Sequence, residues 1–141
     1  MKLSTALPPT LVACFLAFAA CAAPERDMAA DEIAALDDFE ELMWVKATVA
    51  DPRFDLAEEL EGATLEDDQW AEFADMGRRL QLTSAKGIEF GKGAGFDAYF
   101  EQLAEQAAAL ETAAADRDAQ RTLSLALGIK DTCKACHREY R

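Results

Sequence analysis

Two cysteines and a histidine near the C-terminus carry the most specific chemistry in this sequence. They form the segment Cys133-Lys134-Ala135-Cys136-His137, and Cys-x-x-Cys-His is the attachment pattern of a c-type haem. On a helix, residues three and four apart share one face. Both thiols can therefore add to the two vinyl groups on one edge of a porphyrin. The imidazole of His137 can bind the iron as a proximal ligand, so the spacing predicts one covalent haem.

The chain contains a single histidine, His137, and this limits the kinds of site that it can build. It excludes a bis-histidine haem and zinc sites that need several histidines. Peroxidase-like chemistry would require a distal base, and no second histidine supplies one. We therefore expect a haem protein that is not an enzyme.

Three other interpretations of the two cysteines are open. A thioredoxin-type redox pair would follow a strand in a mixed α/β fold, and no strand pattern precedes Cys133. A zinc site would need a fourth ligand, such as a carboxylate, beside two cysteines and the histidine. A structural disulfide would leave the position of His137 unexplained.

The composition indicates one folded and strongly acidic domain. The chain has 141 residues, and 51% of them are hydrophobic, which is enough for a sizeable core. Lys and Arg number 14 against 27 Asp and Glu, a formal net charge of −13. Such a surface repels phosphate backbones and argues against nucleic-acid binding. It favours a redox partner with a basic docking face and a salt-sensitive, transient encounter.

Residues 1–23 have the pattern of a secretory signal peptide. Lys2 gives a positive start, and residues 11–20 form an apolar run that is too short to span a bilayer comfortably. Export leads to an oxidising compartment, where the two cysteines of the motif must be bridged, metallated or covalently modified. The sequence therefore predicts a periplasmic protein whose mature domain comprises residues 24–141.

The end of the apolar run is compatible with two forms of the mature N-terminus. Phe18-Ala19-Ala20-Cys21 resembles a bacterial lipobox, in which the cysteine is acylated and becomes the first residue. A terminus that carries more than one acyl chain would anchor the protein stably to the membrane. The alternative is ordinary export, in which cleavage one or two residues after Cys21 removes this cysteine and leaves no anchor.

Apolar residues recur at helical spacing in four stretches of the mature chain, with breakers between them. The stretches run from about 29 to 50, from 64 to about 84, from about 96 to 115, and from 116 almost to 141. Strand patterns are nearly absent. Helices of matched length that are joined by loops of modest size predict an all-α protein, an antiparallel four-helix bundle.

Proline, glycine and capping residues predict where these helices begin and end. Asp51-Pro52 is expected to end or kink the first helix, because proline lacks a backbone donor. Residues 86–95 hold four of the seven glycines and indicate a loop. Thr64 and Asp116 are the expected N-cap residues of the second and fourth helices.

An exported helical domain of this size that ends in Cys-x-x-Cys-His resembles the class II c-type cytochromes, the cytochrome c′ group. The closing segment from Cys133 to Arg141 is similar to the family's ending, with an aromatic residue at Tyr140 and a basic residue at Arg141. The resemblance implies a haem inside the bundle, enclosed by the first, third and fourth helices. It also implies that Arg141 lies close to the proximal histidine, and homodimers are common among such proteins.

The resemblance makes the other face of the iron decisive for function. With no second histidine in the chain, the sixth ligand is a Met, a Lys or water, or it is absent. Low-spin members of the family place a Met there, on the first helix, whereas high-spin members leave the face open behind a bulky apolar side chain. Met43 lies on the apolar stripe of the first helix and is the candidate distal ligand. Filling core space is its alternative role.

Other residues are weaker candidates by position, since Met28 is at the start of the first helix and Met76 is on the second. If Met43 faces elsewhere, Leu42 or Phe39 is the expected apolar plug. A Met ligand favours one-electron transfer because it stays bound in both oxidation states and raises the potential. We therefore expect an exported monohaem cytochrome that transfers electrons between extracytoplasmic proteins. The alternative is a five-coordinate, high-spin haem protein that binds NO or CO.

Overall fold

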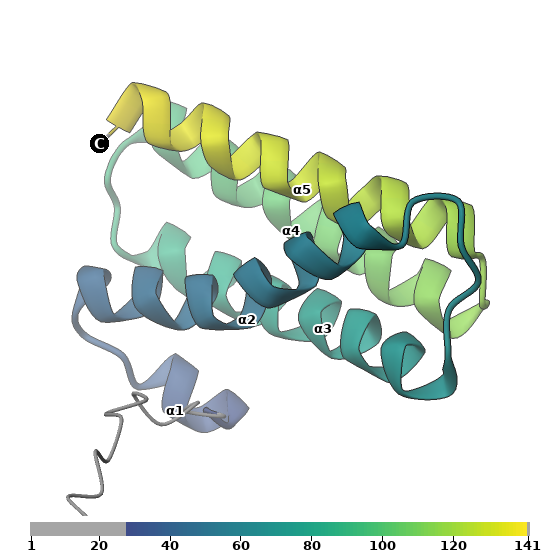
Figure 1. Cartoon of the computed structure of the whole chain (residues 1–141). Coiled ribbons are helices and arrows are strands. Elements are labelled where there is room, and N and C mark those ends of the chain that lie inside the picture. The colour runs from purple at the N-terminus through teal and green to yellow at the C-terminus, as the bar shows by residue number, and fades with distance from the viewer. Residues whose placement is uncertain (1–27, 141) are drawn as a thin grey trace, which may run out of the picture.

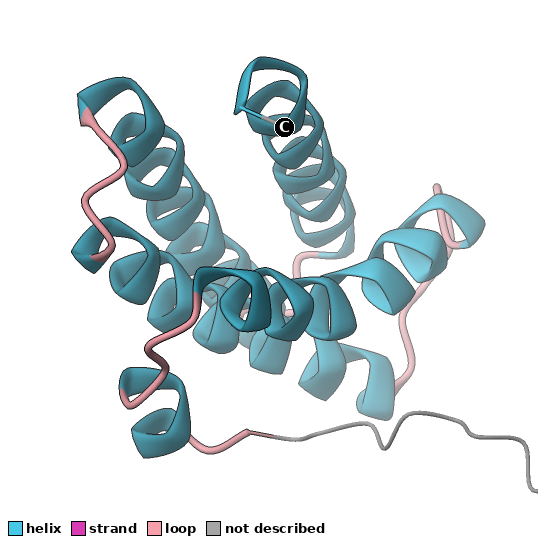
Figure 2. Cartoon of the chain, turned by 90° about the vertical axis from the view of Figure 1, so that its left-hand side faces the viewer, coloured by secondary structure: helices cyan, strands magenta, loops and turns pink. Residues whose placement is uncertain are grey.

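The regular elements of the protein are all helical across residues 28–140, the range that the computed structural model describes. In chain order they are α1 (Ala30–Ala34), α2 (Phe39–Glu59), α3 (Asp67–Glu89), α4 (Ala94–Ala115) and α5 (Ala119–Tyr140). The four long helices alternate in direction, and the short α1 lies outside them, against α3 (Figures 1 and 2). The predicted all-α four-helix bundle is confirmed.

The export signal predicted for residues 1–23, its Cys21 and the basic residue Arg141 lie outside the described part of the chain. Between residues 28 and 140, no helix combines the length and apolar character needed to cross a membrane.

The main core lies where α3 and α4 pack closely together. Gly77 of α3 makes this approach achievable, because a Cβ atom there would lie 2.7 Å from the carbonyl oxygen of Ala107 and 2.8 Å from the backbone nitrogen of Glu111. The fully buried side chains around this contact include Phe73, Met76, Leu80 and Leu110. Each such burial contributes roughly 1.5–3 kcal/mol. The α3–α4 pair is the base on which α2 and α5 are placed.

The first helical stretch differs from the prediction of one helix over residues 29–50. The chain forms α1, breaks, and restarts at Phe39, where the Asp38 carboxylate accepts a hydrogen bond of 2.7 Å from the backbone N–H of Glu41. The helix then continues through Pro52 to Glu59. Figure 1 shows α2 bending along its length toward α5, so the proline bends the helix and does not end it.

Tertiary packing explains why α2 continues beyond Pro52. Phe54 and Ala57 follow the proline and are buried in the main core, so continuing the helix keeps both side chains out of water. Near the end of α2, Lys130 Nζ of α5 donates a hydrogen bond of 2.6 Å to Glu58 Oε1. The loss of one backbone hydrogen bond at the proline is offset by this burial.

The second helix begins later and ends later than the sequence predicted. Thr64 is exposed and precedes the helix, while Glu66 is the N-cap, with its backbone N–H donating to Gln69 Oε1 at 2.8 Å. At the other end, α3 runs through Gly87, so the loop predicted for residues 86–95 is reduced to residues 90–93. A Gly87 Cβ atom would overlap a ring of α4. This glycine therefore serves helix packing and not a turn.

The N-cap of the last helix also lies two residues later than the sequence predicted. Asp116 is the C-cap of α4 and does not begin α5. Asp118 caps α5 instead, because its carboxylate accepts a hydrogen bond of 3.1 Å from the backbone N–H of Arg121. The connection is short, and it places α5 antiparallel to α4.

Candidate haem-binding site

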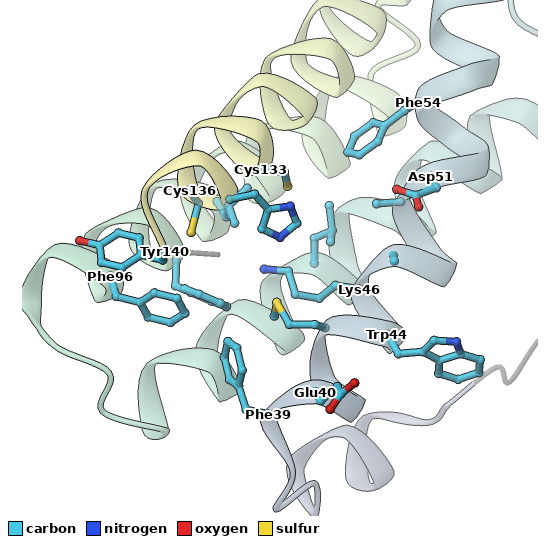
Figure 3. Close-up of a pocket in the computed structure, with 17 residues that line it drawn as sticks. Phe39, Glu40, Trp44, Lys46, Asp51, Phe54, Phe96, Cys133, Cys136 and Tyr140 are labelled. Carbon is cyan, nitrogen blue, oxygen red and sulfur yellow. The ribbon is translucent and has the colours of Figure 1, made fainter.

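A cavity of about 710 Å³ lies between α2 and α5, near the C-terminal end of α5 (Figure 3). This volume is in the range of roughly 300–1,000 Å³ that is usual for cofactor sites. Helices α2, α4 and α5 supply most of its wall, and α3 adds one leucine. The apolar lining residues include Phe39, Ala50, Phe54, Leu80, Phe96, Phe100 and Leu103. The walls are therefore the first, third and fourth long helices, as the family resemblance implied.

The three residues of the sequence motif lie together on the α5 wall of this cavity. Cys133 is half-buried and Cys136 is buried, and neither is in a disulfide. His137 lies one helical turn beyond Cys133 and lines the same cavity. The two thiols and the imidazole thus open into one space, as their spacing in the sequence predicted.

Burial makes the two thiols less acidic. Desolvation raises the pKa of Cys133 and of Cys136, and the positive charge of Lys46 opposes this effect at both. Since the thiolate is the form that exchanges with disulfides and binds metals, these thiols are poorly activated for redox exchange. This observation weighs against a thioredoxin-type pair.

Aromatic contacts hold the end of α5 against α4. The hydroxyl of Tyr99 donates a hydrogen bond of 3.0 Å to Glu139. The ring of Tyr140 meets the ring of Phe96 edge-on, with centroids 5.4 Å apart. Directly before Cys133, Thr132 is buried, and its hydroxyl donates to the carbonyl oxygen of Gly128, one turn earlier in the same helix, at 3.1 Å. The contacts of Tyr99 and Tyr140 between the two helices orient α5 so that the motif faces the cavity.

The α2 wall, opposite the motif, includes the predicted distal candidate. Met43 lines the cavity and is half-buried, packed against the aromatic cluster around Phe96 and against the small core beside α1. Met76 is fully buried in the main core, and Met28 is buried beside α1. Neither of these two lines the cavity. Among the methionines of residues 28–140, Met43 alone is placed to face a haem.

The two apolar plugs named as alternatives occupy different places. Leu42 is fully buried in the small core beside α1 and is not a cavity residue. Phe39 lines the cavity and packs against Phe96, with ring centroids 5.5 Å apart. Of these two residues, Phe39 alone lines the cavity and is the remaining candidate for a steric plug over the iron.

Lys46 is the cavity residue that the sequence reasoning missed. Its side chain is only 7% exposed and reaches from α2 into the cavity toward α5 (Figure 3). The Nζ atom lies 4.1 Å from the ring centroid of Phe100. Burial lowers the pKa of the amine to about 8, although the two cysteines act in the opposite direction. The signal in the sequence was spacing, because Lys46 follows Phe39 by seven residues and Met43 by three.

The residues of the cavity fit a covalently attached haem. A flat, mostly apolar macrocycle needs an apolar lining, and its attachment needs two thiols and an imidazole on one wall; both are present. The competing zinc interpretation finds no support here, because residues 28–140 contain no group of three or more His, Cys, Asp or Glu side chains placed to hold a metal ion.

A family model described as Cytochrome C′ matches residues 55–141. The match covers the end of α2, the helices α3 and α4, and α5 with its motif. It begins beyond most of the α2 wall, including Met43 and Lys46. A comparison with curated proteins and another with solved structures found no match.

Proposed function

Because the chain belongs to the cytochrome c′ family and is therefore a monohaem c-type cytochrome, we propose that it transfers single electrons between extracytoplasmic redox proteins. The observation that supports this proposal is that side chains able to bind iron lie on two opposite walls of the cavity. His137 faces it from α5, while Met43 and Lys46, two side chains able to bind iron, face it from α2. Protein ligands on both faces would keep the coordination unchanged as an electron enters and leaves, which favours rapid transfer.

Each residue of the motif has a defined task under this proposal. Cys133 and Cys136 form the two thioether bonds, and His137 is the proximal iron ligand. The haem supplies the one-electron chemistry when it is bound. Met43 stays a candidate distal ligand, and Arg141 stays the basic residue expected beside His137. The aromatic and aliphatic lining, which includes the buried Phe100, would keep water from the haem and lower the local dielectric, which tunes the potential.

The surroundings of the protein belong to the same proposal. The net charge of −13 favours partners with a basic docking face and a salt-sensitive encounter. Cytochromes of this family are typically extracytoplasmic, which agrees with a periplasmic protein, either free or anchored by a lipid on Cys21. We propose no enzymatic activity, since His137 is the only imidazole of the chain. Assembly as a homodimer stays an expectation.

Binding of NO or CO at a five-coordinate haem is the second candidate function. The observation that favours it is Phe39, which lines the cavity from α2. A bulky apolar side chain over an open iron is the arrangement that the high-spin alternative requires. In that case neither Met43 nor Lys46 would be bound to the iron.

A visible absorption spectrum of the holoprotein, expressed in a host that attaches haem c, tests the proposal. Sharp ferrous α and β bands that do not change when CO is added are expected for a six-coordinate, low-spin haem. A broad high-spin band that shifts with CO would contradict electron transfer and support gas binding. A colourless protein would contradict both functions.

Two variants at the end of α5 test the role of His137. His137→Ala should retain the mass of one covalent haem but lose the low-spin spectrum, because the thioethers form at other residues. Arg138→Ala, an exposed neighbour, is the matched control and should keep the wild-type spectrum. An unchanged spectrum in His137→Ala would show that another group binds the iron.

A further inference from the structure

Lys46 is a buried amine whose position the family assignment does not explain. The other buried polar residues between positions 28 and 140 are the neutral Thr83, Ser84, Thr122 and Thr132. We propose that Lys46 Nζ, and not Met43, is the distal ligand of the haem iron, opposite His137. This inference rests on the proposed function, because it names the group that makes the iron six-coordinate.

The first support is the direction of the side chain. A lysine near a protein surface normally extends its amine into water, and water is close by, since the adjacent cavity residue Ala47 is exposed. Lys46 nevertheless points into the cavity toward the α5 wall (Figure 3). Its 7% exposure therefore reflects a specific placement and not a lack of access to solvent.

The second support is the absence of an anionic partner in the described range. Within residues 28–140, no hydrogen bond or ion pair involves Nζ, whose close contact is the face of the Phe100 ring at 4.1 Å. Glu40 and Asp51 also line the cavity, but both are exposed and neither pairs with Lys46. A buried ammonium without a counter-ion is unfavourable, and the contact with one ring compensates only part of that penalty.

Binding to iron would remove this penalty. The amine releases its proton to solvent and donates the freed nitrogen lone pair to the metal. Burial favours the neutral amine over the ammonium, so the cavity already disfavours the form that cannot bind. Lys46 lines the same cavity as Cys133 and Cys136, so the amine faces the wall where the haem is attached.

Met43 does not need such an explanation. It is half-buried, and it packs against two apolar clusters, one beside α1 and one around Phe96 and Phe100. Filling irregular apolar space is the ordinary role of a methionine, and it accounts fully for this position. The two residues therefore differ in that packing explains Met43 and leaves Lys46 unexplained.

The test uses the ferric holoprotein and three single variants. Low-temperature electron paramagnetic resonance reports spin state, and near-infrared magnetic circular dichroism distinguishes an amine from a thioether opposite histidine by the position of the charge-transfer band. The wild type should be low-spin with an amine-type band. Lys46→Leu should lose the low-spin signal and gain a high-spin one. Met43→Leu and the control Lys86→Leu, which removes a lysine paired with Glu89 on α3, should keep the wild-type signals.

The possible results separate this inference from the proposed function. A low-spin wild type with a thioether-type band, or a low-spin signal that survives in Lys46→Leu, would overturn the assignment of Lys46 and leave electron transfer standing. A high-spin wild type that binds CO would overturn the proposed function and this inference together. The wild-type band decides between the two ligands even if Lys46→Leu does not fold.

Discussion

Gly87 of α3 lies against the Phe100 ring, which supports Lys46 in the cavity, so Gly87→Ala links helix packing to the site. A Cβ atom at this position would lie 2.0 Å from Cε1 and 2.2 Å from Cδ1 of Phe100. Carbon atoms pack at about 3.5–4.0 Å, so the ring would have to retreat by roughly 1.5 Å or more. Phe100 is buried and stacks against Phe96 with centroids 4.8 Å apart, and this contact resists the movement.

The magnitude follows from two opposing effects. Replacing a helical glycine with alanine stabilises by up to about 1 kcal/mol, whereas overpacking a filled core costs about 1–3 kcal/mol. Because the overlap at Gly87 is severe, we expect a net destabilisation of about 1–2 kcal/mol, or a fall in Tm of roughly 3–10 °C. Gly128→Ala is the matched control in α5, since its Cβ would meet only Gln106 Nε2, at 3.8 Å. That variant should be stabilised.

Thermal and urea unfolding of the two holoproteins, followed by far-ultraviolet circular dichroism, measures this difference. Haem absorption recorded in parallel should shift in Gly87→Ala, because Phe100 lines the cavity, and should not shift in Gly128→Ala. If Gly87→Ala proves as stable as Gly128→Ala, then α3 does not set the position of the Phe100 ring, and the reasoning fails.

Three further predictions concern the core, the thiols and the surface. In Gly77→Ala, the new Cβ atom would lie 2.7 Å from the backbone of α4 and would push α3 and α4 apart. The free energy of unfolding, measured in urea, should fall by about 1–3 kcal/mol; a stabilised variant would contradict the close α3–α4 contact. In the haem-free protein, alkylation of Cys133 should need a higher pH than alkylation of a peptide thiol, because burial raises the pKa of Cys133. Lys46→Leu should move the pH dependence of alkylation to still higher pH, because the positive charge of Lys46 opposes this effect. Alkylation of Cys133 at a lower pH than the peptide thiol would contradict this reasoning. At low salt, a cationic complex should oxidise the reduced protein, whose net charge is −13, faster than an anionic one, and added salt should narrow the difference; equal rates would argue against electrostatic docking.

Local patterns explain which parts of the fold could be predicted. Helical periodicity depends only on the order of apolar residues along the chain, and it correctly indicated four long helices. The helix ends were harder because they depend on contacts made elsewhere. Proline at position 52 is normally a stop, but burial of Phe54 beyond it keeps α2 helical. Gly87 is normally a loop residue, but it accommodates a ring from α4.

At the α2 wall of the cavity, too, contacts made elsewhere in the fold decide what local patterns leave open. Ala47 and Lys46 both line the cavity, but Ala47 is exposed and Lys46 is buried. Neighbouring residues on a helix are separated by about 100° around its axis, so the rotation of α2 decides which of the two is the more deeply buried. That rotation is set by the break before Phe39 and by the packing of Leu42 beside α1.

By itself, the sequence determined the chemistry of attachment, because two thiols and an imidazole that share one helical face are encoded by their spacing alone. The tertiary structure decided what faces them. That α2 presents Phe39, Met43 and Lys46 together to the cavity depends on how that helix is rotated and seated against its neighbours. Such rotation is the sum of many distant packing contacts, and no short stretch of residues contains it.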